Sequence, residues 1–252
     1  MPEVGTCEKG IVRCLATFAL LLGSFAVTAD EGNVDDTFRY FAVSVPQLAE
    51  APVLDGVVEE DEWQGAAMGP RFYQQSKDTP REYFLTDRML QTYFACTEEG
   101  LLVAWRMERP EGAREPAAQV TTRDGRFWRK DDALELQLDC IKENPKGWRE
   151  YGDFYFIWNA IGTQFDRRHY PAFDPKWNPN WICRNHIDPE FGWEGEVLFP
   201  FEIFEPATVP EPGDMWGLFF AGNRTTPEPL LEPMTATWAR CGDFTHLLFS
   251  GT

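Results

Sequence analysis

The sequence predicts an all-β protein, a two-layer antiparallel β-sandwich of immunoglobulin-like or jelly-roll-like architecture with one or two short helices. Three observations support this fold class. Apolar and polar residues alternate with a period of two in most apolar segments, as they do in half-buried strands. The 20 Gly and 19 Pro residues are spread along the 252 positions without a period, which favours many short elements joined by turns. Ten Trp and 20 Phe residues supply a ring-rich core and exclude a disordered acidic chain.

The first 29 residues are predicted to be a signal peptide that is cleaved on export. Lys9 and Arg13 precede an apolar stretch that runs from Leu15 to Val27. This stretch of about 13 residues is shorter than the roughly 20 that cross a bilayer, so we expect no membrane insertion after cleavage. Residues 30–252 are then expected to form a single domain with a secreted or periplasmic location.

The clearest alternation lies in residues 132–139 and 153–159. In the first segment three Leu residues share one face and Glu135 lies on the other. In the second, large aromatic residues share one face, opposite to Tyr155 and Asn159. Each pattern predicts a half-buried strand. Further strands are expected at residues 39–45, 90–96, 101–107, 180–187, 193–199, 216–222, 235–239 and 244–249.

Helical pieces are expected at residues 59–67, after the Asp55-Gly56 turn, and at residues 201–204. Residues 108–124 and 167–179 read as long loops rich in Pro and polar or aromatic residues. Loops of this length are often functional, so we expect them to carry binding residues.

Charge and motifs exclude several functions. With 41 acidic against 23 basic side chains the formal net charge is −18, which makes nucleic acid and anionic membrane surfaces unfavourable partners. The sequence has no GxSxG, no Gly-rich phosphate loop, no HExxH and no calcium-binding DxDxDG loop. We therefore predict no catalytic residue, and any link to hydrolysis of glycosidic bonds would be indirect.

Four of the six cysteines lie outside the predicted leader: Cys96, Cys140, Cys183 and Cys241. An even number in an oxidising compartment allows two disulfides in any of three connectivities, and buried thiols are the alternative. These cysteines do not form a CxxC pair, so the sequence does not predict a zinc site.

The tryptophans divide into two groups. Five lie within or beside apolar strands or helix and are assigned to the core: Trp63, Trp105, Trp158, Trp193 and Trp216. Four lie in or next to loops: Trp128, Trp148, Trp177 and Trp181. In an exported protein a loop indole either stacks on the apolar face of a sugar or closes the edge of the sandwich.

Six segments, ordered along nearly the whole mature chain, carry a family resemblance. The first, PVLDGVVEEDEW, ends at Trp63, and the second, DALELQLD, begins at Asp132. They are followed by YFIWNAIGT, GWEGEVLFP, PGDMW and a C-terminal WARCGDFTHL. In this order the segments resemble the carbohydrate-binding modules of family 9 and the related secreted β-sandwich domains.

The resemblance implies a non-catalytic domain that binds a polysaccharide or oligosaccharide, acting in polysaccharide recognition or degradation. It also implies a bound calcium ion, for which the sequence shows no recognisable ligand set. In such modules two Trp rings clamp the sugar and Glu, Asn and Arg side chains bind its hydroxyls. The site residues that we predict on this basis are Trp128, Glu135, Tyr155, Asn159, Trp177, Trp181 and Arg224. Trp148, Trp177 or Trp181 would replace the second clamp ring, unless the domain has lost the clamp.

Two other functions stay open at this point. A structural or interaction domain would keep the sandwich but lose the sugar site, and its own loops would then fill that face. A haem-binding relative would need a Met/His or His/His pair that faces a deep apolar pocket. The residues available for such a pair are Met107, Met215, Met234, His169, His186 and His246.

Overall fold

The computed structural model describes residues 42–69, 73–75, 83–85, 90–109, 115–126, 130–141, 152–224, 234–237 and 245–251. For residues 73–75, 83–85, 223–224, 234–237 and 245 it describes the backbone alone. The predicted leader lies outside these residues, so its cleavage and the boundaries of the mature domain stay predictions. No helix among the described residues is long and apolar enough to cross a membrane.

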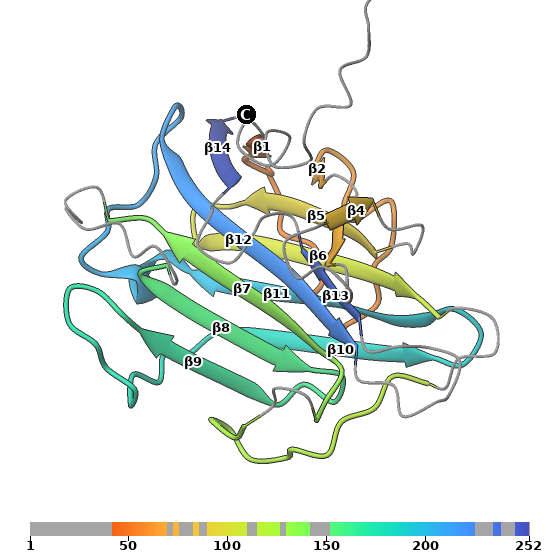
Figure 1. The fold of residues 1–252 in the computed structure, drawn as a ribbon. Coiled ribbons are helices and arrows are strands. Elements are labelled where there is room, and N and C mark those ends of the chain that lie inside the picture. Colours follow the sequence, from red (N-terminus) through yellow and green to blue (C-terminus); the bar gives the residue numbers. More distant parts are fainter. Residues whose placement is uncertain are drawn as a thin grey trace, which may run out of the picture. The chain divides into compact units, whose positions relative to one another are not determined.

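The described strands form two sheets (Figure 1). The nine-stranded sheet has the order β4 (Tyr83–Leu85), β3 (Tyr73–Gln75), β13 (Met234–Thr237), β12 (Met215–Arg224), β7 (Ala133–Asp139), β8 (Phe154–Asn159) and β9 (Gln164–Arg168). Beside β12 it also carries β14 (Thr245–Gly251), which pairs in turn with β1 (Ala42–Pro46). The five-stranded sheet has the order β10 (Ile182–Asp188), β11 (Gly192–Pro200), β6 (Gly100–Glu108), β5 (Leu90–Cys96) and β2 (Ala67–Met68).

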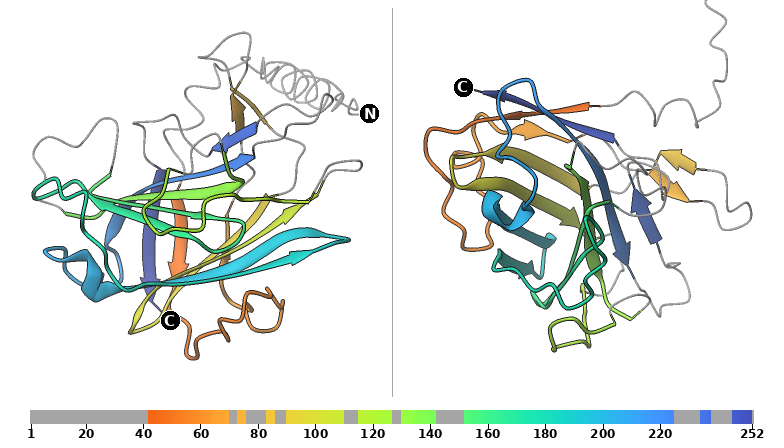
Figure 2. Two further views of the ribbon diagram at one scale, coloured as in Figure 1. Left: turned by 90° about the horizontal axis from the view of Figure 1, so that it is seen from below. Right: turned by 90° about the vertical axis from the view of Figure 1, so that its left-hand side faces the viewer.

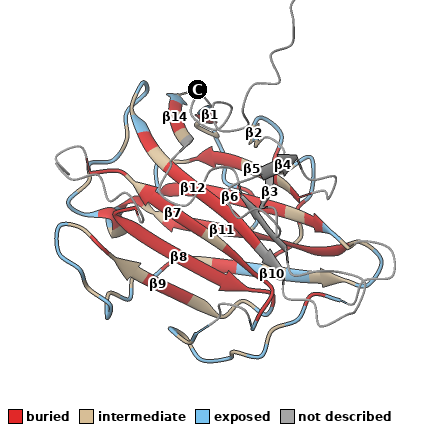
Figure 3. Ribbon diagram, in the orientation of Figure 1, coloured by how far each residue is buried: buried red, intermediate tan, exposed pale blue. Residues whose placement is uncertain are grey.

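The two sheets lie one above the other and bury a shared core between their inner faces (Figure 2). Aromatic rings from both sheets meet there: the centroids of Phe156 and Phe199 are 4.5 Å apart, and those of Trp105 and Trp158 are 5.3 Å apart. Buried residues run along β7, β8 and β11 (Figure 3). The predicted sandwich is confirmed, and four of the five tryptophans assigned to its core lie there: Trp105, Trp158, Trp193 and Trp216. Trp63 is also buried, but in a second cluster that includes Val58 and Leu198.

The strands predicted from alternation are present with small shifts at their ends. Among the described strands every pair is antiparallel except β1 with β14, which is parallel. Three very short strands, β2, β3 and β4, were not predicted, because two or three residues carry no readable period. Strand β9 was also missed, because its sequence QFDRR is mostly polar.

Of the two expected helical pieces, residues 201–204 form a 3-10 helix, η2 (Phe201–Phe204). Residues 59–67 do not form a helix. They make consecutive turns, with an i→i−4 bond from Trp63 N to Glu59 O and i→i−3 bonds elsewhere. Gly65 ends the segment with φ at +95°, a left-handed conformation that a helix does not continue through.

A carboxylate anchors this turn segment to the outer face of the five-stranded sheet. Glu196 on β11 accepts hydrogen bonds from Asp55 N and Gly56 N, both at 3.0 Å, and from Trp63 Nε1 at 2.9 Å. Burial raises the pKa of Glu196, and these three donors counteract the rise. The DG and W of the N-terminal motif therefore have a structural role, because both bind the same buried side chain.

The three described cysteines, Cys96, Cys140 and Cys183, are free and buried. In a framework of two disulfides among the four cysteines, one of these three would pair with Cys241 and the other two would pair with each other. All three are free, so the predicted two-disulfide framework is absent. Burial raises the pKa of each of the three thiols, which keeps them protonated and unreactive. Cys241 lies outside the described residues.

Candidate functional site

The outer face of the nine-stranded sheet brings polar and aromatic side chains from three neighbouring strands together. Tyr155 on β8 is in register with Gln137 on β7 and with Arg167 on β9. Glu135 lies two residues from Gln137 on the same face of β7. We call this set, completed by residues at and after the end of β9, the outer-face cluster: Glu135, Gln137, Tyr155, Phe165, Arg167, His169 and Phe173.

Glu135 is half-buried, and its neighbours hold its carboxylate in place. The Gln137 Nε2 donates to Glu135 Oε1 at 2.7 Å, and Tyr155 makes a second side-chain hydrogen bond. Gln137 is itself fixed, because its Oε1 accepts from Gly152 N at 3.2 Å. Burial raises the pKa of Glu135, while the two hydrogen bonds lower it. Such an oriented carboxyl group is able to bind the hydroxyls of a ligand.

Three rings stack beside this carboxyl group. The ring of His169 lies 6.1 Å from Tyr155 on one side and 5.7 Å from Phe173 on the other, with interplanar angles of 25° and 8°. His169 Nδ1 is 3.0 Å from the Gly152 carbonyl oxygen, which fixes the ring. Tyr155 and His169 are buried, whereas Phe173 is 58% exposed. The stack therefore presents one aromatic side chain to solvent.

Arg167 lies over Phe173 of this stack and over the neighbouring Phe165, with Cζ 5.5 Å and 5.1 Å from the two ring centroids. Burial lowers the pKa of His169, and the charge of Arg167 lowers it further, against a raising effect from the Gly152 hydrogen bond and Asp153. The imidazole is thus biased towards its neutral form. Arg167 supplies the positive charge of the outer-face cluster.

Asn159, predicted as a sugar ligand, is fully buried. Its Nδ2 donates to Val120 O and Asp131 Oδ2, both at 2.8 Å, and its Oδ1 accepts from Thr163 N at 2.8 Å. The side chain holds the segment 115–126 against the end of β8. It has no exposed polar atom for a ligand, so its role is structural.

Trp177 and Trp181, predicted as sugar platforms, lie on the opposite side of the nine-stranded sheet, away from Glu135. The ring of Trp177 is 5.2 Å from Phe154 and packs at the edge of the core. Trp181 is 3% exposed and stacks on Phe199 at 5.2 Å. Both close the edge of the sandwich, which is the alternative that the sequence left open for loop tryptophans.

Two further predicted residues lie wholly or partly beyond the described structure. Trp128 lies outside the described residues, between the described segment 115–126 and Lys130. Arg224 is described by its backbone alone, at the end of β12 in register with Met234 of β13. Their part in a sugar site stays a prediction.

A second buried carboxylate lies at the edge of the sandwich. Asp166 on β9 is 1% exposed and accepts from Trp181 Nε1 at 3.1 Å and from the Arg123 guanidinium. Arg123 also donates to Pro179 O at 2.8 Å. Burial raises the pKa of Asp166 to about 6, despite the lowering effect of Trp181 and Arg123. The ion pair between Arg123 and Asp166 joins the segment 115–126 to the edge of the core.

Asp166 is expected to make stability depend on pH. Between about pH 4 and 6 the folded protein keeps a proton on Asp166 that the unfolded chain has released, so this group lowers stability as the pH rises. The difference in unfolding free energy, Asp166→Asn minus wild type, should therefore rise by on the order of 2 kcal/mol from pH 4 to pH 7. Urea unfolding at four pH values measures it. The exposed Asp61→Asn is the control, and an equally flat difference for both variants would contradict the assignment.

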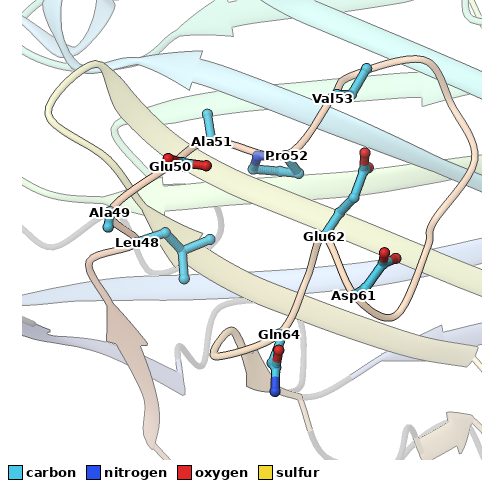
Figure 4. A pocket seen from close by; sticks show the side chains of 9 residues that line it. All are labelled: Leu48, Ala49, Glu50, Ala51, Pro52, Val53, Asp61, Glu62 and Gln64. Carbon is cyan, nitrogen blue, oxygen red and sulfur yellow. The ribbon is translucent and has the colours of Figure 1, made fainter.

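A cavity of about 480 Å³ lies elsewhere, along the segments 48–53 and 61–64 (Figure 4). Three carboxylates line it, those of Glu50, Asp61 and Glu62, and no aromatic ring does. It therefore lacks a surface on which a sugar ring could stack. Within the described part of the chain, no group of three or more His, Cys, Asp or Glu residues is arranged to hold a metal ion.

Five members of the outer-face cluster were not predicted as site residues: Gln137, Phe165, Arg167, His169 and Phe173. The last three fall in the predicted loop 167–179, although Arg167 and His169 continue the period-two pattern of Phe165. That continuation into RRHYPAF, with cationic and aromatic residues on one face, was the available signal.

Comparison with known proteins identifies the fold. No family model and no curated protein matches the sequence. A carbohydrate-binding module of family 9 from Caldicellulosiruptor kristjanssonii in complex with cellotriose aligns at 16% identity with a TM-score of 0.56, over 84% of this chain and 94% of that one. The same kind of module from that organism in complex with glucose gives 16% identity and a TM-score of 0.55, over 84% and 96%.

A third solved structure, a Bacteroides uniformis protein described as carbohydrate-binding, aligns at 16% identity with a TM-score of 0.60, over 83% of this chain and 99% of that one. Identities this low show the fold alone. The resemblance to family 9 that the sequence motifs indicate is thus confirmed as a likeness of fold.

Proposed function

We propose that this protein is a secreted, non-catalytic carbohydrate-binding domain whose sugar site is the outer-face cluster. The observation that carries the proposal is the union of an oriented carboxyl group, a guanidinium group and an exposed aromatic ring on one sheet face. Glu135 and Arg167 supply hydrogen-bonding groups for hydroxyls, and Phe173 supplies apolar surface for the sugar ring. The fold shared with sugar-binding modules supports the same reading.

The first probes are soluble β-glucans and cellotriose, because a module of the same fold holds cellotriose. A role in polysaccharide degradation, and Trp128 as a further sugar-binding ring, are part of the proposal. Trp128 lies four residues before Asp132 in the sequence, near the start of the strand that carries Glu135. A calcium ion rests on the family resemblance alone.

Replacing Phe173 with alanine should weaken sugar binding about five- to tenfold, because the exposed ring is removed while the buried rings remain. Glu135→Gln should weaken it by about tenfold or more through loss of a charge-assisted hydrogen bond. Affinity gel electrophoresis with soluble polysaccharides, followed by calorimetry with cellotriose, measures both. Val209→Ala is the matched control, since Val209 is also 58% exposed but lies in the loop after η2.

A structural or interaction domain that has lost the sugar site is the second candidate. The burial of Asn159 and Trp181 favours it, because two predicted ligands serve the fold instead. Under this reading a well-folded protein would show no retardation in any polysaccharide gel, and Phe173→Ala would change nothing. Retardation that is reduced in Phe173→Ala but kept in Val209→Ala excludes it.

A further inference from the structure

Arg167 is a cation that is held in place with no acidic partner among the residues that the structure describes. Phe165 and Phe173 lie beneath its guanidinium group, at 5.1 and 5.5 Å from Cζ. Across the described residues no hydrogen bond or ion pair involves this group, and its Nε is buried without a hydrogen-bond partner. The rings therefore fix the position of the guanidinium group, and no carboxylate in the described segments pairs with it.

Most of the other arginines in the described segments differ in this respect. Four of them pair with a carboxylate: Arg106 with Glu194, Arg109 with Glu115, Arg123 with Asp166 and Arg168 with Asp174. The contrast is sharpest with Arg168, the next residue along β9. Arg126 and Arg184 also lack a carboxylate partner among the described residues, but both are exposed, whereas Arg167 is partly buried against two rings. A guanidinium group held in this way, with no described carboxylate, points to an acceptor supplied by a ligand.

Burial shifts the pKa of three titratable groups on the outer face of the nine-stranded sheet. Burial raises the pKa of Glu135 and of Asp139 on the same face of β7, with hydrogen bonds to Gln137, Tyr155 and Asp153 opposing the rise. Burial lowers the pKa of His169. Burial therefore disfavours the charged form of both carboxyl groups on this face.

We propose that Arg167 binds a carboxylate on the sugar, so that the ligand of the outer-face cluster is an acidic saccharide that contains uronic acid units. This inference rests on the proposed function and names its ligand class. A planar carboxylate accepts two parallel N–H bonds from a guanidinium group, a geometry that a neutral hydroxyl does not offer. Phe173, beside Arg167, contacts the apolar face of the same sugar ring.

The direct test compares two ligands on the unmodified protein. Trigalacturonate and its methyl ester differ in charge but share the same rings and hydroxyls. Calorimetry should show the ester binding about 10- to 100-fold more weakly, because the charge-assisted pair with Arg167 is lost. Equal affinity for the two trimers would overturn the inference, and no variant needs to fold for this result to count.

Three variants locate the effect. Arg167→Gln should reduce trigalacturonate affinity about 10- to 100-fold and leave the ester within about twofold. Arg167→Lys should recover part of the loss, because the charge returns without the paired N–H geometry. Arg184→Gln removes the same charge from an exposed position on β10 and should bind like wild type. Preference for the acid that persists in Arg167→Gln would overturn the inference.

Cellotriose separates this inference from the proposed function. Binding of cellotriose as tight as that of trigalacturonate leaves the sugar site in place and overturns the acidic ligand. Failure of cellotriose, trigalacturonate and its ester to bind contradicts both. Tight binding of trigalacturonate, with weak binding of its methyl ester and of cellotriose, supports both the sugar site and the acidic ligand.

Discussion

Replacing Trp158 with alanine should lower the free energy of unfolding by roughly 3–5 kcal/mol, the range for removing a large buried ring. Trp158 is fully buried on β8, and its ring lies 5.3 Å from Trp105 and 6.3 Å from Phe199. These two partners belong to the five-stranded sheet, so the indole joins the two layers. Its loss leaves a cavity at the centre of the sandwich.

Urea unfolding followed by circular dichroism measures this cost. Trp158→Phe should cost less, since an aromatic ring remains in contact with both layers. Met215→Ala, at a side chain that is 57% exposed, is the surface control and should stay within about 0.5 kcal/mol of wild type. A cost below about 1 kcal/mol for Trp158→Ala would contradict the position of this residue in the shared core.

Glu196→Ala should lower the free energy of unfolding by roughly 3 kcal/mol, because three buried or part-buried donors lose their acceptor together. These donors are Asp55 N, Gly56 N and Trp63 Nε1. Their loss frees the segment 48–66 from the five-stranded sheet and exposes apolar residues beneath it. Glu196→Gln keeps an acceptor oxygen and should cost less.

Hydrogen exchange gives a local measure of the same change. The amides of Asp55 and Gly56 should exchange slowly in wild type and at least about tenfold faster in Glu196→Ala, since each loses its acceptor. Glu60→Ala, at an exposed position in the same segment, is the control. Unchanged exchange at both amides would show that Glu196 does not anchor the segment.

The strands could be predicted where one face is apolar and the other polar. The three Leu residues of β7 and the alternation on β8 placed Glu135 and Tyr155 on the outer face, as the structure has them. Strand β9 escaped prediction because Phe165 is its one apolar residue and the inner-facing Asp166 is charged. Arg123 and Trp181 satisfy that charge from 43 and 15 residues away, which no local pattern reveals.

The candidate site could be predicted only in part, because the positions of several of its predicted residues depend on contacts with residues that are distant in the sequence. A sequence motif places Asn159 beside a ligand, but two of its hydrogen-bond partners, Asp131 and Val120, lie 28 and 39 positions away. Trp181 reads as a loop ring, yet Phe199 of the opposite sheet covers it. Whether a loop aromatic faces solvent or the core depends on the path of the loop. The period of the sequence fixes faces of strands and carries no information on that path.

The central prediction is that a sugar binds the outer face of the nine-stranded sheet around Glu135. Titration of the 15N-labelled protein with saccharide, followed by amide chemical shifts, tests this claim most directly. We predict shifts at Glu135, Tyr155, Arg167 and Phe173, with residues 48–64 around the acidic cavity unchanged. Shifts confined to residues 48–64, or none with any of the saccharides, would contradict it.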